Sequence, residues 1–145
     1  MQLNELIALY EQDGWVGKWA EQLCAAVGQR WHLKGLAGSL DALLVAALYK
    51  HTANAQLCIM HDREEAAYFY SDLCNLLGPA VVLLYPSSHN QPYAPTVTDN
   101  ADQLMRAEVL YRLQQHTDHQ APVVVTYPAA LPEKVVHQEA RTEHT

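Results

Sequence analysis

Short apolar runs alternate along the chain with longer segments of helical periodicity, and this alternation limits the possible folds more than any other feature. We expect strands near 31–35 and at 56–61, 81–85 and 123–126. We expect helices between them at 39–51, 62–77 and from 98 or 99 to about 113. The run at 81–85 is apolar at every position, which is typical of a strand in a sheet that is covered on both faces.

Strands that alternate with helices predict an α/β domain with a mainly parallel sheet, helices on both faces and right-handed crossovers. Asp62 followed by Glu65 is a capping-box signature for the second of these helices. Further upstream, an amphipathic helix is predicted by the spacing of Leu3, Leu6, Ile7 and Tyr10. A second helix, ending near Gly28, is predicted by Trp15, Val16, Trp19, Leu23 and Val27. We divide the chain into N-terminal helices at 1–30, an α/β subdomain at 31–136, and a polar tail at 137–145 that looks like a cut in a longer chain.

The charge and the cysteines narrow the classes of function. The formal net charge is −7, and the nine Lys and Arg residues are scattered. Because affinity for nucleic acid rests mainly on neutralised phosphates, direct DNA binding is not expected. No apolar run is long enough to span a membrane, and the N-terminus carries no basic segment, so we expect a cytoplasmic protein. Three cysteines far apart, each inside an apolar stretch, predict reduced, buried thiols and no disulfide.

The stretch GLAGSLDA, residues 35–42, lies where a strand–turn–helix unit would hold a phosphate-binding loop. A working loop reads G-x-x-x-x-G-K-[ST]. With Gly35 at the first glycine, the other three defining positions hold Leu40, Asp41 and Ala42. Two unit charges about 4 Å apart interact by roughly 1 to 4 kcal/mol between water and an effective dielectric of 20, so replacing Lys by Asp reverses a substantial attraction.

We therefore predict that this loop does not bind nucleotide. Gly35 and Gly38 would form a tight turn, and Ser39 or Asp41 would cap the following helix. The same residues suit a helix N-terminus without any ligand, because an acidic side chain there complements the helix dipole.

Other candidate sites have weaker patterns. His116 and His119 have a spacing that suits a metal, but they lack further ligands, so no metal is expected. Ser87, Ser88 and His89 are neighbours without a nucleophile-elbow motif. The loop 86–98 is a possible interaction loop, with these residues as its candidate contacts: His89, Pro92, Tyr93 and Pro95. Trp15 and Trp19 are interpreted as packing residues, with a partner-binding stripe as the alternative.

Four segments together resemble the N-terminal region of the bacterial transcription-repair coupling factors. They are LKGLAGSLDALLVAALYK, CIMHDREEAAYFYSDLCNLLG, VLLYPSSHNQPYAPTVTDNADQLMRAEVLYRL and VVVTYPAALPEKV. The resemblance runs from about residue 31 to 136. Its most specific parts are PYAP followed by an R-x-x-x-L-x-x-L helix, and VVVTYPAAL.

The resemblance implies a P-loop NTPase or helicase-like fold, similar to the first domain of the excision nuclease B subunit, with degenerate nucleotide motifs. It implies that residues 35–42 are the remnant of a P-loop and that this fragment is not an enzyme. ATP and Mg²⁺ would bind only in distant motor domains of a large DNA translocase. The implied partners are neighbouring domains of the same chain, the excision nuclease A subunit through an adjacent domain, and RNA polymerase and DNA through the rest of that protein.

Two other functions stay open at this point. One is a divergent nucleotide-binding or hydrolase α/β domain that uses the loop 86–98, because the carboxyl edge of a parallel sheet is the usual ligand site. The other is an adaptor that binds a partner through Trp15, Trp19 and Tyr93.

Overall fold

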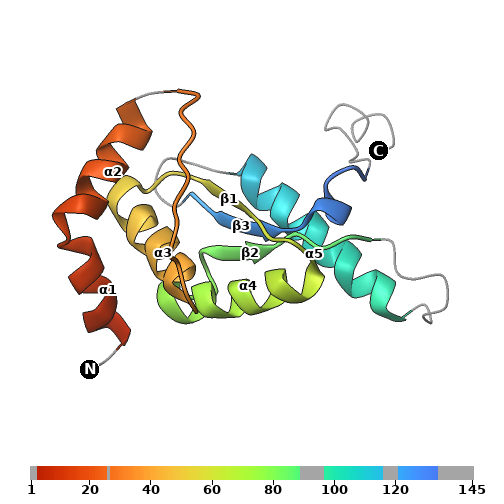
Figure 1. Cartoon of the computed structure of the whole chain (residues 1–145). Coiled ribbons are helices and arrows are strands. Elements are labelled where there is room, and N and C mark those ends of the chain that lie inside the picture. The colour runs from red at the N-terminus through yellow and green to blue at the C-terminus, as the bar shows by residue number, and fades with distance from the viewer. Residues whose placement is uncertain (1–2, 26, 89–96, 116–120, 134–145) are drawn as a thin grey trace.

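A computed structural model of the protein describes residues 3–25, 27–88, 97–115 and 121–133 (Figure 1). The elements follow in the order α1 (Leu3–Glu11), α2 (Gly14–Ala25), α3 (Leu40–Thr52), β1 (Gln56–Ile59), α4 (Arg63–Leu77), β2 (Val82–Leu84), α5 (Val97–Gln114), β3 (Val123–Thr126) and the 3₁₀ turn η1 (Pro128–Ala130). The described part of the chain is therefore a mixed α/β structure.

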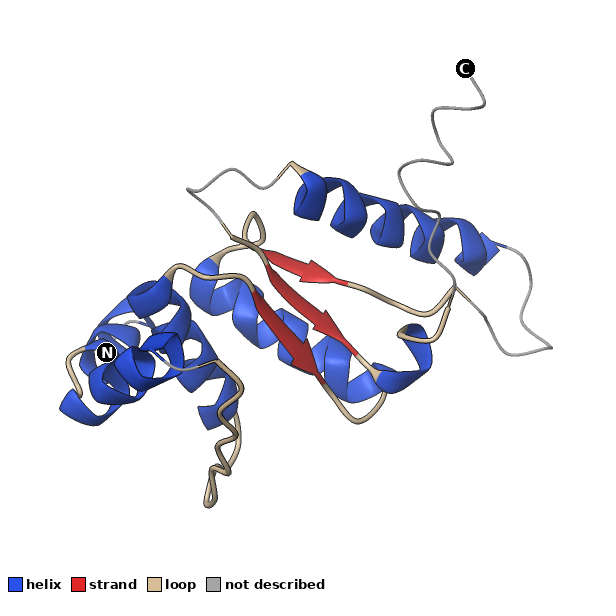
Figure 2. Cartoon of the chain, turned by 90° about the horizontal axis from the view of Figure 1, so that it is seen from above, coloured by secondary structure: helices blue, strands red, loops and turns tan. Residues whose placement is uncertain are grey.

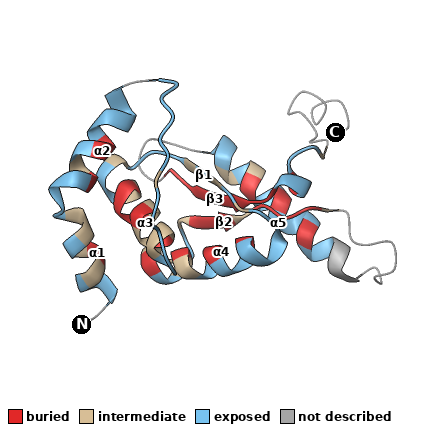
Figure 3. Cartoon of the chain, in the orientation of Figure 1, coloured by how far each residue is buried: buried red, intermediate tan, exposed pale blue. Residues whose placement is uncertain are grey.

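The sheet has three parallel strands in the order β1-β3-β2, with the last strand of the sequence in the centre. Val124 of β3 lies opposite Leu57 of β1 on one side and Leu83 of β2 on the other. All four residues of β3 are buried (Figure 3). This fits a strand of nearly uniform apolar composition that is paired along both edges.

The strand order also determines where the helices pack. The crossover from β1 to β2 passes over β3, and the crossover from β2 to β3 returns in the opposite direction. Two right-handed crossovers that run in opposite directions place their helices on opposite faces of a sheet. Figure 1 shows α4 below the sheet and α5 behind it, and Figure 2 shows α5 beyond β2. Helix α4 contacts β2 and β3, whereas α5 contacts β2.

The core joins the sheet to the N-terminal helices. Phe69 and Leu73 of α4 pack in one cluster with the valines of β3, and Ile7 of α1 belongs to the same cluster. Helix α3 lies between the sheet and the N-terminal helices, since it contacts α1, α2 and α4. The N-terminal helices therefore share a core with the α/β part of the described chain.

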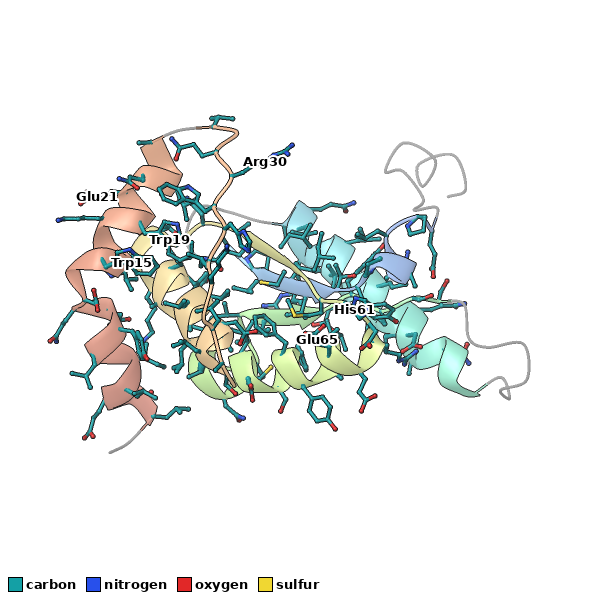
Figure 4. The ribbon with its side chains drawn as sticks, viewed as in Figure 1. Trp15, Trp19, Glu21, Arg30, His61 and Glu65 are labelled. Carbon is teal, nitrogen blue, oxygen red and sulfur yellow. The ribbon has the colours of Figure 1, made fainter. Side chains whose placement is uncertain are left out.

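Several sequence-based predictions are confirmed. The sheet is parallel, α3 and α4 lie where the periodicity places them, and Asp62 is the N-cap of α4. Its carboxylate accepts a hydrogen bond from the Glu65 backbone N–H at 2.8 Å, and Glu65 in turn accepts one from the His61 N–H at 2.8 Å. Figure 4 labels His61 and Glu65 at this end of α4. The three cysteines are free thiols, but Cys24 is exposed, and Cys58 and Cys74 are only partly buried.

The prediction of a strand at 31–35 is wrong, so the described sheet has three strands instead of four. These residues have no regular secondary structure. Leu33 packs instead against Val16 of α2 and Leu44 of α3, while Trp31 is 46% exposed. Leu33 also packs against Trp19 and Leu48, so contacts with helices α2 and α3 take the place of strand pairing in this segment.

Two helix boundaries also differ from the prediction. Helix α2 ends at Ala25, so Val27 lies outside it and is fully exposed. Helix α5 begins at Val97, before the predicted capping residues Thr98 and Asp99. Among the described residues, no helix combines the length and hydropathy needed to cross a bilayer.

The Asp62 cap gives a test of the local energetics. Asp62→Ala should lower the free energy of unfolding by about 0.5–2 kcal/mol, because the Glu65 N–H loses its acceptor. The matched control is Asn75→Ala, an exposed position on the same helix, which should change it by less than about 0.5 kcal/mol. Urea denaturation followed by circular dichroism measures both, and equal effects of the two substitutions would contradict the assigned cap.

Candidate functional site

The polar side chains that the fold brings together lie at the carboxyl edge of the sheet. Ser87 and Ser88 follow β2, and Tyr127 follows β3 directly. Because β2 and β3 are parallel neighbours, their carboxyl ends meet, and the Ser87 N–H donates a hydrogen bond to the Tyr127 hydroxyl at 2.8 Å. Open parallel sheets bind ligands at this edge, which makes the cluster the main candidate site.

Arg106 of α5 is buried in this cluster, with 7% of its surface exposed. Its Nη1 donates to the carbonyl oxygens of Pro86 at 2.8 Å and Ala130 at 3.2 Å. The guanidinium carbon lies 4.1 Å from the centroid of the Tyr85 ring, a cation–π contact. A single side chain thus links α5 to the segments that leave β2 and β3.

Glu133 supplies the negative charge that a buried guanidinium needs. Its carboxylate Oε2 lies 3.3 Å from Arg106 Nη1, and both side chains are 9% exposed. The Ser88 N–H donates to both carboxylate oxygens, at 2.9 and 3.0 Å, and the Ser88 hydroxyl donates to Oε2 at 2.6 Å. The Ser87 hydroxyl donates to Oε1. Hydroxyl, amide and guanidinium donors therefore converge on one carboxylate.

These contacts determine the acidity of Glu133. Burial by itself would raise the pKa of this carboxyl group, but the hydrogen bonds from Ser87 and Ser88 and the charge of Arg106 outweigh it and lower the pKa to about 2. A general base is most effective when its pKa is near the working pH. Glu133 is therefore poorly suited to take the proton of the Ser87 hydroxyl, and the donors around it stabilise its ionised form.

A second ion pair joins the two crossover helices near the same edge. Arg63, the first residue of α4, donates through Nη2 to Asp102 Oδ1 of α5 at 3.1 Å. Asp102 is 4% exposed and lies one helical turn before Arg106. One face of α5 therefore carries an acidic and a basic side chain that are both paired across the fold.

The predicted P-loop remnant lies apart from this cluster, in the turn that leads into α3. Gly35 and Gly38 both have positive φ, 81° and 61°, whereas a Cβ on either would meet no atom within 4 Å. The glycines are therefore needed for backbone conformation and not for close approach to another group. Because 31–35 is not a strand, the strand–turn–helix unit of a P-loop is not formed.

Asp41 interacts with the helix N-terminus itself. Its Oδ1 accepts a hydrogen bond from the Ala42 N–H at 2.8 Å, and Ser39 is the N-cap without a side-chain hydrogen bond. Of the two predicted capping residues, Asp41 thus supplies the carboxylate contact. Desolvation raises the pKa of the Cys58 thiol to about 11, with a smaller contribution from the Asp41 charge, so little thiolate forms near pH 7.

Several predicted site residues lie outside the described part of the chain. These are the interaction-loop residues His89, Pro92, Tyr93 and Pro95 and the histidine pair His116 and His119. Within the described residues, no group of three or more His, Cys, Asp or Glu side chains could hold a metal ion.

Trp15 and Trp19 form a stacked pair on α2, with ring centroids 5.4 Å apart (Figure 4). Trp19 is 9% exposed and packs near Leu48 of α3, as the packing interpretation expects. Trp15 is 52% exposed and lines a recess of about 410 Å³ together with Tyr10 and His32. The two residues therefore divide between core and surface.

The sequence points to Ser87 and Ser88 as neighbouring hydroxyls and to a helix pattern that begins at Arg106. It does not predict that Glu133 pairs with them. Nothing in the sequence links Glu133 to Ser88, because the contact arises only when β3 is inserted beside β2. The available signal was the position of Arg106, four residues before Leu110 and seven before Leu113, on the apolar face of the predicted helix.

Comparison with known proteins adds no identification. No family model matches the chain, and searches of the curated proteins and of the solved structures give no match.

The Glu133 contacts predict a specific pH dependence. Since the folded-state pKa of about 2 lies below the ordinary value of 4.5, these contacts stabilise the fold fully above about pH 4.5 and are lost as the pH falls toward 2. By this linkage, acidification should remove up to about 3 kcal/mol in the native protein and less in Glu133→Gln. Chemical denaturation at a series of pH values measures the difference, and parallel profiles would contradict the assignment.

Proposed function

We propose that this chain is a non-catalytic N-terminal scaffold subdomain of a transcription-repair coupling factor. In this proposal it has a helicase-like fold with a degenerate P-loop, resides in the cytoplasm, and positions neighbouring domains of a longer polypeptide. ATP hydrolysis, DNA translocation, displacement of RNA polymerase and recruitment of the excision nuclease A subunit belong to other parts of that polypeptide.

The observation that carries the non-catalytic part of the proposal is the contact between Asp41 and Ala42. A phosphate-binding loop offers the backbone N–H groups at the start of its helix to the phosphate. Here the Ala42 N–H already donates to the Asp41 carboxylate at 2.8 Å. A nucleotide phosphate would have to compete with this carboxylate for the N–H and would be repelled by its charge.

Two further properties support an inert scaffold. The parallel three-stranded sheet with flanking helices is compatible with a helicase-like subdomain, although many other α/β proteins share it. The net charge of −7 opposes direct contact with DNA.

A titration with Mg-ATP tests the absence of nucleotide binding. The native protein should give no saturable heat in calorimetry up to about 1 mM Mg-ATP, a limit that corresponds to about 4 kcal/mol of binding free energy. Asp41→Lys should also fail to bind, because Leu40 and Ala42 still occupy the positions of the second glycine and the hydroxyl residue.

The matched control is Glu21→Lys, which makes the same change of charge at an exposed position on α2 (Figure 4). Comparing the two variants separates an effect of the loop 35–42 on Mg-ATP binding from an effect of the changed net charge. Saturable binding by the native protein at micromolar Mg-ATP would overturn the proposal.

The size of the native polypeptide tests the membership of a larger protein. An antibody raised against this chain should detect a band far larger than 16.2 kDa in a cell lysate. RNA polymerase should co-precipitate with that band. A band at the mass of this chain alone would overturn the scaffold proposal.

The alternative of a hydrolase that uses the loop 86–98 receives less support. It needs an activated nucleophile near the carboxyl edge, and the low pKa of Glu133 makes that carboxylate a weak base for Ser87.

A further inference from the structure

We propose that Ser87, Ser88 and Arg106 form a binding site for a phosphate group, which the carboxylate of Glu133 occupies until phosphate displaces it. The site does not depend on the proposed scaffold function, because it lies at the carboxyl edge of the sheet and not at the degenerate loop 35–42. The chemical class of its ligand follows from its hydrogen-bond donors alone.

The donor set matches an oxyanion. The Ser88 N–H reaches both carboxylate oxygens, at 2.9 and 3.0 Å, while the two serine hydroxyls each donate to a different oxygen. Arg106 supplies a full positive charge at 3.3 Å from Oε2. Phosphate presents pairs of oxygens in an arrangement close to that of a carboxylate and accepts the same charge-assisted hydrogen bonds.

The place of the site in the fold also favours a ligand. The loops after β1 and β2 lead to helices on opposite sides of the sheet, and β3 lies between them. Such a change of direction is where open parallel sheets bind ligands outside the carboxyl ends of their strands. The Ser87–Ser88 segment follows β2 at this point, with its backbone N–H groups turned to Tyr127 and Glu133.

Glu133 is attached in a way that permits exchange. It follows Leu131 and Pro132, which are both exposed, so the carboxylate enters the cluster from a surface segment. Removing it from Ser88 would leave β3 and the sheet pairing unchanged, since neither involves Glu133. An external phosphate can therefore replace the internal carboxylate without unfolding the core.

The test compares Glu133→Ala with the native protein in titrations with inorganic phosphate at pH 7 and constant ionic strength. The backbone N–H signals of Ser87 and Ser88, followed by ¹⁵N NMR, should shift and saturate in the variant. The native protein should need at least about tenfold more phosphate, because the tethered carboxylate competes at a high effective concentration. A phosphoserine peptide in a second titration distinguishes free phosphate from a phosphate carried by a protein, and binding of either supports the site.

Three further variants keep the test decisive. Glu64→Ala removes a negative charge at an exposed position of α4 and should leave the response of Ser88 as in the native protein. Ser88→Ala combined with Glu133→Ala should bind phosphate more weakly than Glu133→Ala alone, because the Ser88 hydroxyl is lost while the backbone N–H and Arg106 remain. If Glu133→Ala does not fold, Glu133→Asp, whose shorter side chain retracts the carboxylate, should bind phosphate more tightly than the native protein. No response of Ser88 in a folded variant, or equal affinity in variant and native protein, would overturn the proposal.

Discussion

The rest of the structure depends on the insertion of β3 between β1 and β2. The two outer strands pair with β3 and not with each other, so neither has a sheet partner until residues 123–126 are in place. Thr126 shows how tightly this strand is held: its hydroxyl donates to the Tyr85 carbonyl oxygen and its own carbonyl accepts from the Met60 N–H, both at 2.8 Å. Every pairing in the sheet is therefore long-range in sequence, which is a feature of proteins that fold slowly.

The same insertion creates the polar cluster. When β3 enters the centre of the sheet, the chain that follows it passes beside the segment that leaves β2, and Glu133 meets Ser87 and Ser88. Arg106 can be buried at this edge because carbonyl oxygens, an aromatic ring and the Glu133 carboxylate surround its guanidinium. Removing one member of a buried ion pair costs more than the pair contributes, so the cluster acts as a unit.

Much of this fold can be predicted because it depends on interactions between residues close in sequence. The parts that depend on contacts between distant segments cannot be predicted in this way. The Asp62 cap could be predicted because it depends on residues three positions apart. The strand at 31–35 was predicted from its apolar pattern alone, but the pattern does not reveal that Leu33 would pack against Val16 and Leu44 instead of pairing in the sheet. The pairing of Glu133 with Arg106 needs the strand order, and the order β1-β3-β2 is not encoded in any single segment.

The helix start at Asp41 and the cluster at Glu133 contain the same kind of interaction, but its consequences for ligand binding differ. In each, a carboxylate of the chain accepts hydrogen bonds that an external anion could otherwise receive. Asp41 bonds to the N–H of the next residue, so an incoming anion cannot displace it far, and its charge stays beside the N–H. Glu133 reaches its donors from an exposed segment, so it can leave and take its charge with it. A site blocked by a sequence neighbour is closed permanently, whereas a site filled from a distant segment can exchange its occupant.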